Sequence, residues 1–420
     1  MPTLQQLVAP DDPMLRALRL GNHQFPGIWN HMMPREFLGL KLPDERRATC
    51  MNCPKSCYED YRPDYRCCTY HPKVPSFLLG LASLTPSGEK VIQKLIDTSA
   101  LLPEGMHHAP AQWVDYLDDL EHESFGKSQK VLCPNLEVET GYCMIHAFRN
   151  SVCSTFYCYK DHGDLGDAFW GHVQTLGSQL EMALGQWSLE AVGFDLLGYF
   201  KTFDRLARRM QDVSRPDGGW QKEALEQLWG SWAGRELELM RACASVIVEQ
   251  KDNLWDIANS YQIKESKAFD KAMVKSVPKR LKDQVDPEDL DEEDAEAARP
   301  RELWLQLLKS YHKLWDLPEG YYHLNPRVVL SVNEQADASE KYYAANPFCL
   351  SFFTRKDGKT LDWRQFLTAP QKELLDLFRD EAHQLDWRFL MRDEIKKVPQ
   401  LKEFLTEMLA QKVLIKRVYH

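Results

Sequence analysis

The sequence lacks the segments that direct a chain into or across a membrane. Its longest apolar run, Phe77 to Leu84, is interrupted by Gly80 and is far shorter than the roughly 18 residues that a membrane span needs. The N-terminus has no positively charged stretch followed by an apolar core, so no signal peptide is expected. We therefore expect a cytoplasmic protein without membrane association.

The short motifs of several common enzyme classes are also absent. The chain has no Gly-x-x-x-x-Gly-Lys-Ser/Thr, no Gly-x-Gly-x-x-Gly after a strand, no Gly-x-Ser-x-Gly and no His-Glu-x-x-His. Positive charge is in deficit, since the formal net charge is -10, whereas nucleic-acid-binding proteins usually present a basic face. These absences disfavour nucleotide-driven enzymes, common hydrolases and zinc proteases, and no nucleic-acid partner is expected.

Cysteine is scarce in most of the chain and abundant in one region. Nine of the eleven cysteines lie between residues 50 and 158, within a chain whose 44% hydrophobic and 27% charged residues are typical of globular proteins. Cytoplasmic cysteines rarely form disulfides, and those that cluster at two- and three-residue gaps are typical of metal ligands or catalytic groups. The candidate metal ligands are Cys50, Cys53, Cys57, Cys67, Cys68, Cys133, Cys143, Cys153 and Cys158.

Thiolates are soft ligands, and four of them complete either a zinc site or an iron–sulfur cluster. Cys50 and Cys53 have the gap of a turn around a metal, and Cys57 follows after three intervening residues. Nine thiols exceed what one four-ligand site needs, so two sites can form, or one site can use part of the set. We predict a [4Fe-4S] cluster because the close triplet can bind three irons, and zinc is the alternative.

The second half of the cysteine region resembles a known family. After Cys133, the run from Cys143 to Cys153 carries isoleucine two positions and Arg149 six positions after its first cysteine. This pattern resembles the zinc- or iron-chelating cysteine-cluster family, the YkgJ-like CxxxCC proteins, across residues 49–160. The chain has His146 where that family usually has tyrosine, and Asn150 where it usually has proline.

This resemblance implies metal binding, and one branch of the family looks like the flagellin lysine N-methylases, which carry an iron–sulfur cluster and methylate lysine. It suggests an iron–sulfur protein with a redox or cluster-dependent enzymatic role, such as lysine methyl transfer to a protein or peptide substrate. The alternative is a non-catalytic, zinc-stabilised binding module. Arg149 can bind cluster sulfurs or a substrate carboxylate, or form a structural ion pair. His71 and His146 can replace a cysteine ligand, although a supporting or surface role is commoner for such histidines.

Apolar periodicity predicts a mainly α fold, in which an irregular cysteine-rich metal-binding domain packs with long amphipathic helices. Helices are predicted over residues 88–102, 173–212, 220–262, 303–315, 370–397 and 399–412, and one strand over residues 327–332. The predicted segments are an N-terminal arm (1–48), the metal or iron–sulfur domain (49–172), a helical region (173–282), an exposed acidic linker (283–299) and a mostly helical C-terminal region (300–420). Cys243 and Cys349 have apolar neighbours and are predicted to be core residues.

Overall fold

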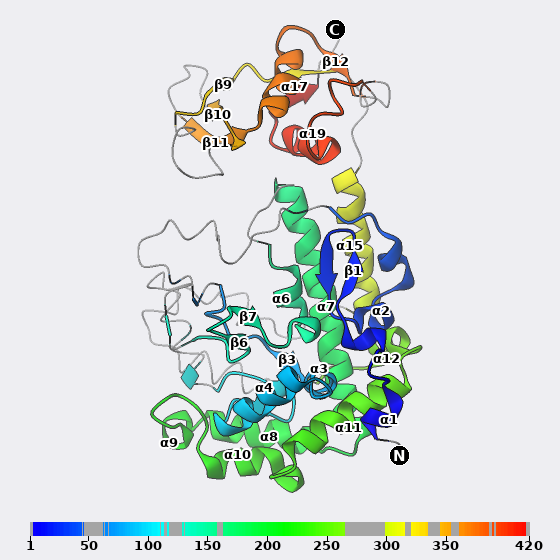
Figure 1. Ribbon diagram of the computed structural model, residues 1–420, viewed down its shortest axis with the longest axis vertical. Helices are drawn as coiled ribbons and strands as arrows, with labels where there is room; N and C mark the ends of the chain where they lie inside the picture. The colour runs from blue at the N-terminus through cyan, green and yellow to red at the C-terminus, as the bar shows by residue number, and fades with distance from the viewer. Residues whose placement is uncertain are drawn as a thin grey trace. The chain divides into compact units, whose positions relative to one another are not determined.

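The computed structural model describes residues 3–43, 45, 62, 64–65, 67–109, 111–112, 116, 128–129, 131–157, 163–264, 299–315, 321–334, 345–353, 361–385, 389 and 392–416. The chain forms two compact units, shown in Figure 1. Unit 1 comprises residues 1–42, 47–158 and 171–307, and unit 2 comprises residues 43–46, 159–170 and 308–420. The predicted acidic linker, residues 283–299, lies outside the described residues except for Arg299. The five predicted segments stay a prediction.

Two tightly packed helices form the centre of unit 1. All seven residues of α3 (Ser76–Ala82) are buried, and its main partner is α11 (Glu236–Glu249). Gly80 makes this close approach possible, because a Cβ atom at this position would lie 2.1 Å from the carbonyl oxygen of Met240. The part of this apolar run that lies in α3, Phe77 to Ala82, is therefore a buried core helix, as expected for a short helix that is apolar on all sides.

Further helices surround this pair and are shorter than the sequence predicts. They are α4 (Pro86–Asp97), α7 (Gly163–Ala191), α8 (Leu196–Ala207), α9 (Met210–Val213), α10 (Lys222–Trp229) and α12 (Leu254–Ser260). The chain leaves α7 through Gly193 at φ +77°, and the side chain of Asp195 then caps α8 by accepting from Gly198 N at 2.9 Å. The prediction of helices in these regions is thus confirmed, but the structure divides the long predicted helices into shorter ones.

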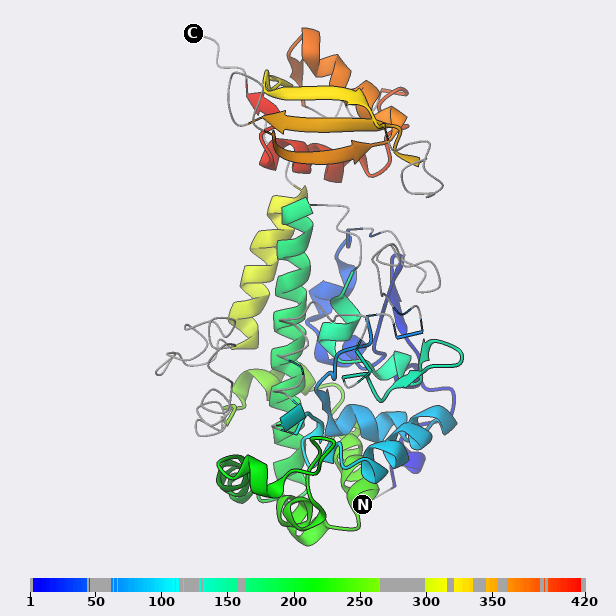
Figure 2. The same cartoon turned by 90° about the vertical axis from the view of Figure 1, so that its left-hand side faces the viewer.

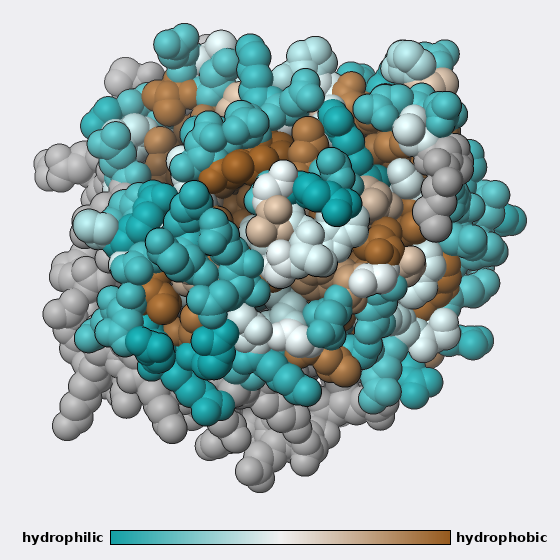
Figure 3. All heavy atoms as spheres, turned by 90° about the horizontal axis from the view of Figure 1, so that it is seen from below, coloured by the Kyte–Doolittle hydropathy of each residue, from teal (hydrophilic) through white to brown (hydrophobic). Residues whose placement is uncertain are grey.

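The face shown in Figure 3 is mostly hydrophilic, with small scattered apolar areas.

Short strands connect the elements of unit 1. The strands β1 (Leu18–Leu20) and β2 (His23–Phe25) form an antiparallel hairpin. The strands β3 (Val74–Pro75), β4 (Leu101–Leu102) and β5 (Gly105–Met106) form a sheet in the order β3-β5-β4. A second hairpin joins β6 (Leu136–Glu137) to β7 (Tyr142–Cys143). Unit 1 also contains the short helices α1 (Leu4–Leu7), α2 (Trp29–Met32) and α6 (Ser151–Thr155).

Unit 2 is built on two three-stranded antiparallel sheets. One has the order β11-β10-β9, with β9 (Val328–Val332), β10 (Phe348–Phe353) and β11 (Leu361–Leu367). The other has the order β12-β8-β13, with β8 (Tyr321–Leu324), β12 (His383–Gln384) and β13 (Leu414–Lys416). The helices α17 (Ala369–Asp380) and α19 (Leu401–Ala410) contribute to the same core, and Figure 2 shows them behind the larger sheet. The predicted strand over residues 327–332 is confirmed as β9.

The prediction of a mainly α fold is wrong, because the described residues combine helices with five small antiparallel sheets. The predicted irregular cysteine-rich domain is likewise wrong as a description, since its described part carries α3, α4, α6 and β3 to β7. Strands of two or three residues are too short to show an alternating pattern. Strand β10 is buried on both faces, so its residues do not alternate between apolar and polar. No described helix is both long enough and apolar enough to cross a membrane.

Candidate functional site

The two halves of the cysteine region meet in unit 1. Cys133 N donates a hydrogen bond to the carbonyl oxygen of Cys68 at 2.6 Å. Three residues after Cys68, the ring of His71 donates through Nε2 to the carbonyl oxygen of Leu132 at 2.9 Å. These two bonds bring residues 68–71 beside residues 132–133, although 64 residues separate Cys68 from Cys133. The two halves of the cysteine region are therefore in contact at Cys68 and Cys133.

The hairpin β6–β7 places Cys143 close to Cys133. Cys143 is opposite Leu136 in the antiparallel register, and Met144 N donates to Asn135 O at 2.8 Å. Gly141, at φ +67°, occupies the left-handed conformation that the turn between the strands requires. Because hydrogen bonds fix the register at both ends of this short hairpin, the position of Cys143 along the segment that carries Cys133 is also fixed.

Asn150 positions Cys153 at the start of α6. The Asn150 Oδ1 atom accepts a hydrogen bond from Cys153 N at 3.1 Å, which is a helix N-cap. Its Nδ2 atom donates to Lys73 O at 2.9 Å, just before β3. Proline could make neither bond, so the asparagine found at this position joins α6 to the segment that follows His71.

The described thiols of the region influence one another. Burial and then the neighbouring Cys143 raise the pKa of the Cys153 thiol to about 12. A hydrogen bond with Cys67 and then burial raise the pKa of Cys68, and burial raises the pKa of Cys133 and of Cys143. All seven described cysteines are free thiols. In the folded protein these grouped thiols therefore hold their protons unless a nearby cation replaces them.

Arg149 is a positive group close to two of these thiols, and Lys94 is close to Cys133. The charge of Arg149 favours the thiolate form of Cys143 and Cys153, against the larger effect of burial. Its Nη2 atom donates to the carbonyl oxygen of Gln24 in β2 at 3.0 Å, while its buried Nε atom has no hydrogen-bond partner among the residues with described positions. Within the same residues Arg149 forms no ion pair, so the structural ion pair considered from the sequence does not account for it there.

Four of the nine predicted ligands, Cys50, Cys53, Cys57 and Cys158, lie outside the described residues. Within the described part of the chain, no three or more Cys, His, Asp or Glu side chains form a group that could hold a metal ion. The structure therefore brings five predicted ligands into one neighbourhood without giving them the geometry of a finished metal site. Those five are Cys67, Cys68, Cys133, Cys143 and Cys153.

The two histidines and the two remaining cysteines are also placed. His71 is bonded to the Leu132 carbonyl, and burial lowers its pKa. His146 lies in a 3-10 turn before Arg149, and partial desolvation and then that guanidinium lower its pKa to about 4. Cys243 in α11 and Cys349 in β10 are confirmed as core residues, with exposed fractions of 0% and 5%.

Sequence reasoning missed a buried acid behind Cys153. Glu181, in α7, is 4% exposed, and its Oε2 atom accepts a hydrogen bond from the hydroxyl of Ser151 in α6 at 2.8 Å. Burial raises the pKa of Glu181 to about 8. A usable signal was present in the sequence, because Glu181 is an acidic residue next to Leu180 and close to Leu184 on an apolar helix face.

A pocket of about 400 Å³ was also missed, and one of its walls includes Cys143. It lies between the first turn of α4 and the β6–β7 hairpin. No sequence pattern signals it, because 45 residues separate Cys143 from the last residue of α4.

Comparison of the chain with models of protein families, with curated proteins and with solved structures found no match.

Proposed function

We propose that this chain binds a [4Fe-4S] cluster through cysteines of residues 50–158, and uses it in a redox or cluster-dependent reaction on a protein or peptide substrate. The observation that carries the proposal is the gathering of Cys67, Cys68, Cys133, Cys143 and Cys153 from three separate segments, all as free thiols. The resemblance to the cysteine-cluster family supports the same proposal and remains an expectation, as does lysine methyl transfer as the reaction.

The donor set fits such a group in two respects. Buried thiols that raise one another's pKa are unfavourable as isolated thiolates, and a bound metal offsets this by replacing their protons. Iron–sulfur clusters with four thiolates are anionic, and hydrogen bonds to their sulfurs tune their potential. The guanidinium of Arg149 could offset the negative charge of the cluster and donate a hydrogen bond to one of its sulfurs. Its buried Nε atom has no hydrogen-bond partner in the described part of the chain.

The residues around the thiols have distinct tasks in this proposal. Asn150 holds Cys153 through its helix cap, and the β6–β7 hairpin holds Cys143. The Gln24 carbonyl orients Arg149 from the N-terminal hairpin. When bound, the cluster would supply electrons or a reactive iron. The triplet of Cys50, Cys53 and Cys57 is proposed to provide ligands, and it lies outside the described residues.

The test is metal and sulfide analysis of protein purified without oxygen. We expect iron and acid-labile sulfide in equal amounts, a brown colour, and an electron-spin-resonance signal after reduction. The variant Cys143→Ser should lose iron, whereas Cys243→Ser, which changes a buried thiol in the α3–α11 core, should keep it. Stoichiometric zinc without sulfide, even after reconstitution with iron and sulfide, would overturn the proposal and favour the zinc-stabilised binding module.

A further inference from the structure

The pocket beside Cys143 is formed by two elements that are fixed to one another. Thr85 caps the N-terminus of helix α4, and its side chain accepts a hydrogen bond from Gly88 N at 3.1 Å. Farther along the helix, Lys94 Nζ donates to the carbonyl oxygen of Pro134 at 3.0 Å, just before the β6–β7 hairpin. The second of these bonds joins α4 to the segment that leads into the hairpin, and the hollow between them has a volume of about 400 Å³. Small-molecule sites have volumes of about 300–1,000 Å³.

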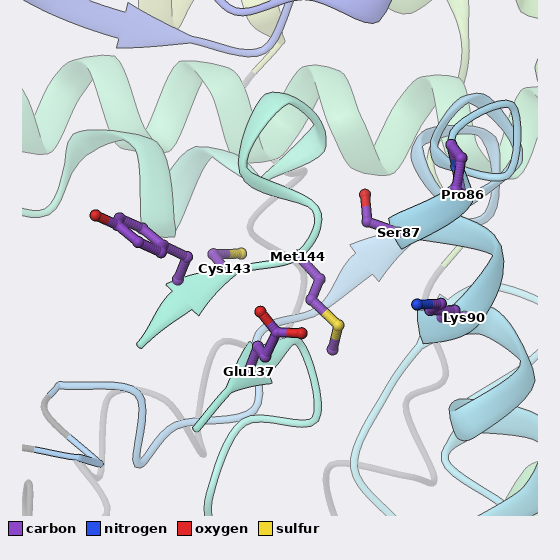
Figure 4. A pocket seen from close by; sticks show the side chains of 7 residues that line it. Pro86, Ser87, Lys90, Glu137, Cys143 and Met144 are labelled. Atoms are coloured by element: carbon purple, nitrogen blue, oxygen red, sulfur yellow. The ribbon is translucent and has the colours of Figure 1, made fainter. Parts of the chain in front are cut away.

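Opposite charges line the two walls. Lys90 projects from α4 and Glu137 from the hairpin, and Figure 4 shows both reaching toward the space that also receives Cys143 and Met144. The Glu137 Oε2 atom accepts a hydrogen bond from the hydroxyl of Thr140 at 2.6 Å, which orients the carboxylate. In the described part of the chain, neither Lys90 nor Glu137 forms an ion pair, so both charges can bind a ligand.

The remaining lining is largely apolar. Pro86 and Met144 contribute aliphatic surface to it. Tyr142 lies at its edge and is 73% exposed, because adjacent residues of a strand point to opposite faces and Cys143 faces the pocket. A ligand suited to this pocket therefore combines one positive group, one negative group and an apolar part.

We propose that this pocket binds a free α-amino acid with an apolar side chain. Its ammonium group pairs with Glu137, its carboxylate pairs with Lys90, and its side chain contacts Met144 and Pro86. A peptide bearing only one free terminus offers one of the two charges, so it binds more weakly. Because Cys143 lines the same pocket, the bound amino acid lies beside a thiol that is proposed to hold the cluster. Binding of the free amino acid does not depend on the proposed cluster or on its protein or peptide substrate.

The experiment is isothermal titration calorimetry of the full chain with three probes. L-leucine carries both charges, its methyl ester only the ammonium, and N-acetyl-L-leucine only the carboxylate. We expect saturable binding of L-leucine and about tenfold weaker binding of each blocked probe, since each loses one charge-assisted hydrogen bond. Lys90→Gln should bind L-leucine and its methyl ester equally, and Glu137→Gln should bind L-leucine and N-acetyl-L-leucine equally.

Matched controls are Glu139→Gln, in the same hairpin turn, and Lys222→Gln, at the start of α10. Neither residue lines the pocket, and both variants should bind L-leucine as the unaltered chain does. Absence of L-leucine binding, or equal binding of all three probes, would overturn the inference. The two proposals fail separately. Purified protein that contains no iron and sulfide but binds L-leucine refutes only the proposed cluster. Protein that contains the cluster but does not bind L-leucine refutes only the proposed amino-acid pocket.

Discussion

The buried carboxyl of Glu181 makes the stability of unit 1 depend on pH in a defined direction. Burial is the main cause that raises its pKa from 4.5 to about 8, and the Ser151 hydroxyl only partly offsets that cost. Below pH 4.5 the carboxyl is protonated in both states and contributes nothing. Between pH 4.5 and about 8 the unfolded chain ionises while the folded chain keeps the proton, so the free energy of unfolding falls as pH rises.

The size of this effect follows from the two pKa values. Each pH unit within the window costs about 1.4 kcal/mol, so the full penalty for this fully buried group reaches about 5 kcal/mol at pH 8 and above. The variant Glu181→Gln keeps an oxygen to accept from Ser151 and removes the ionisation. Relative to the unaltered chain, it should gain about 3 kcal/mol between pH 6 and pH 8.

Urea unfolding followed by tryptophan fluorescence at pH 6, 7 and 8 measures this difference. The control is Glu190→Gln in the same helix, where bonds from Lys264 and Tyr261 outweigh burial and lower the pKa of Glu190. That carboxylate is ionised in both states throughout the range, so its removal should change stability by the same amount at each pH. If the Glu181→Gln difference is also constant with pH, the carboxyl ionises freely in the folded chain and the argument from burial is refuted.

Three further predictions concern packing, capping and the core thiol. Gly80→Ala should lower the free energy of unfolding by about 3 kcal/mol or more, because the added Cβ would clash with the backbone of Met240. The control Gly171→Ala, which has open space around it, should be neutral or stabilising by up to about 1 kcal/mol. Equal effects of the two variants in thermal unfolding would contradict the close approach of α3 and α11. Asn150→Ala should cost about 1–2 kcal/mol in the same assay through loss of the α6 cap, and an unchanged melting temperature would show that the cap is dispensable. Cys243→Ala should leave bound metal unchanged while lowering stability by about 1 kcal/mol, and metal loss from a folded variant would count against its assignment to the core.

Much of the helical content was predictable because it depends on local periodicity. The apolar spacing in residues 220–262 predicts the buried face of α10 and α11. The strands were less predictable. The pairs β3–β5 and β6–β7 each involve two residues of either strand. The partner residues of β3 are separated from it by 29 or more residues, and the partner of β6 is brought back to it by a turn. Such pairs leave no periodic trace in the sequence.

For the candidate site, too, some features were predictable from the sequence and others depend on the tertiary structure. The spacing of the cysteines by itself identified the region and its soft-ligand chemistry, because thiols at short gaps are a local property of the chain. Only the tertiary structure decided that Cys68 lies against Cys133, that the N-terminal hairpin orients Arg149, and that a pocket opens beside Cys143. Each of these contacts joins residues that are dozens of positions apart. Such contacts are selected by the packing of the whole unit, in which burial and backbone hydrogen bonding must be satisfied together, and no local pattern of residues encodes that choice.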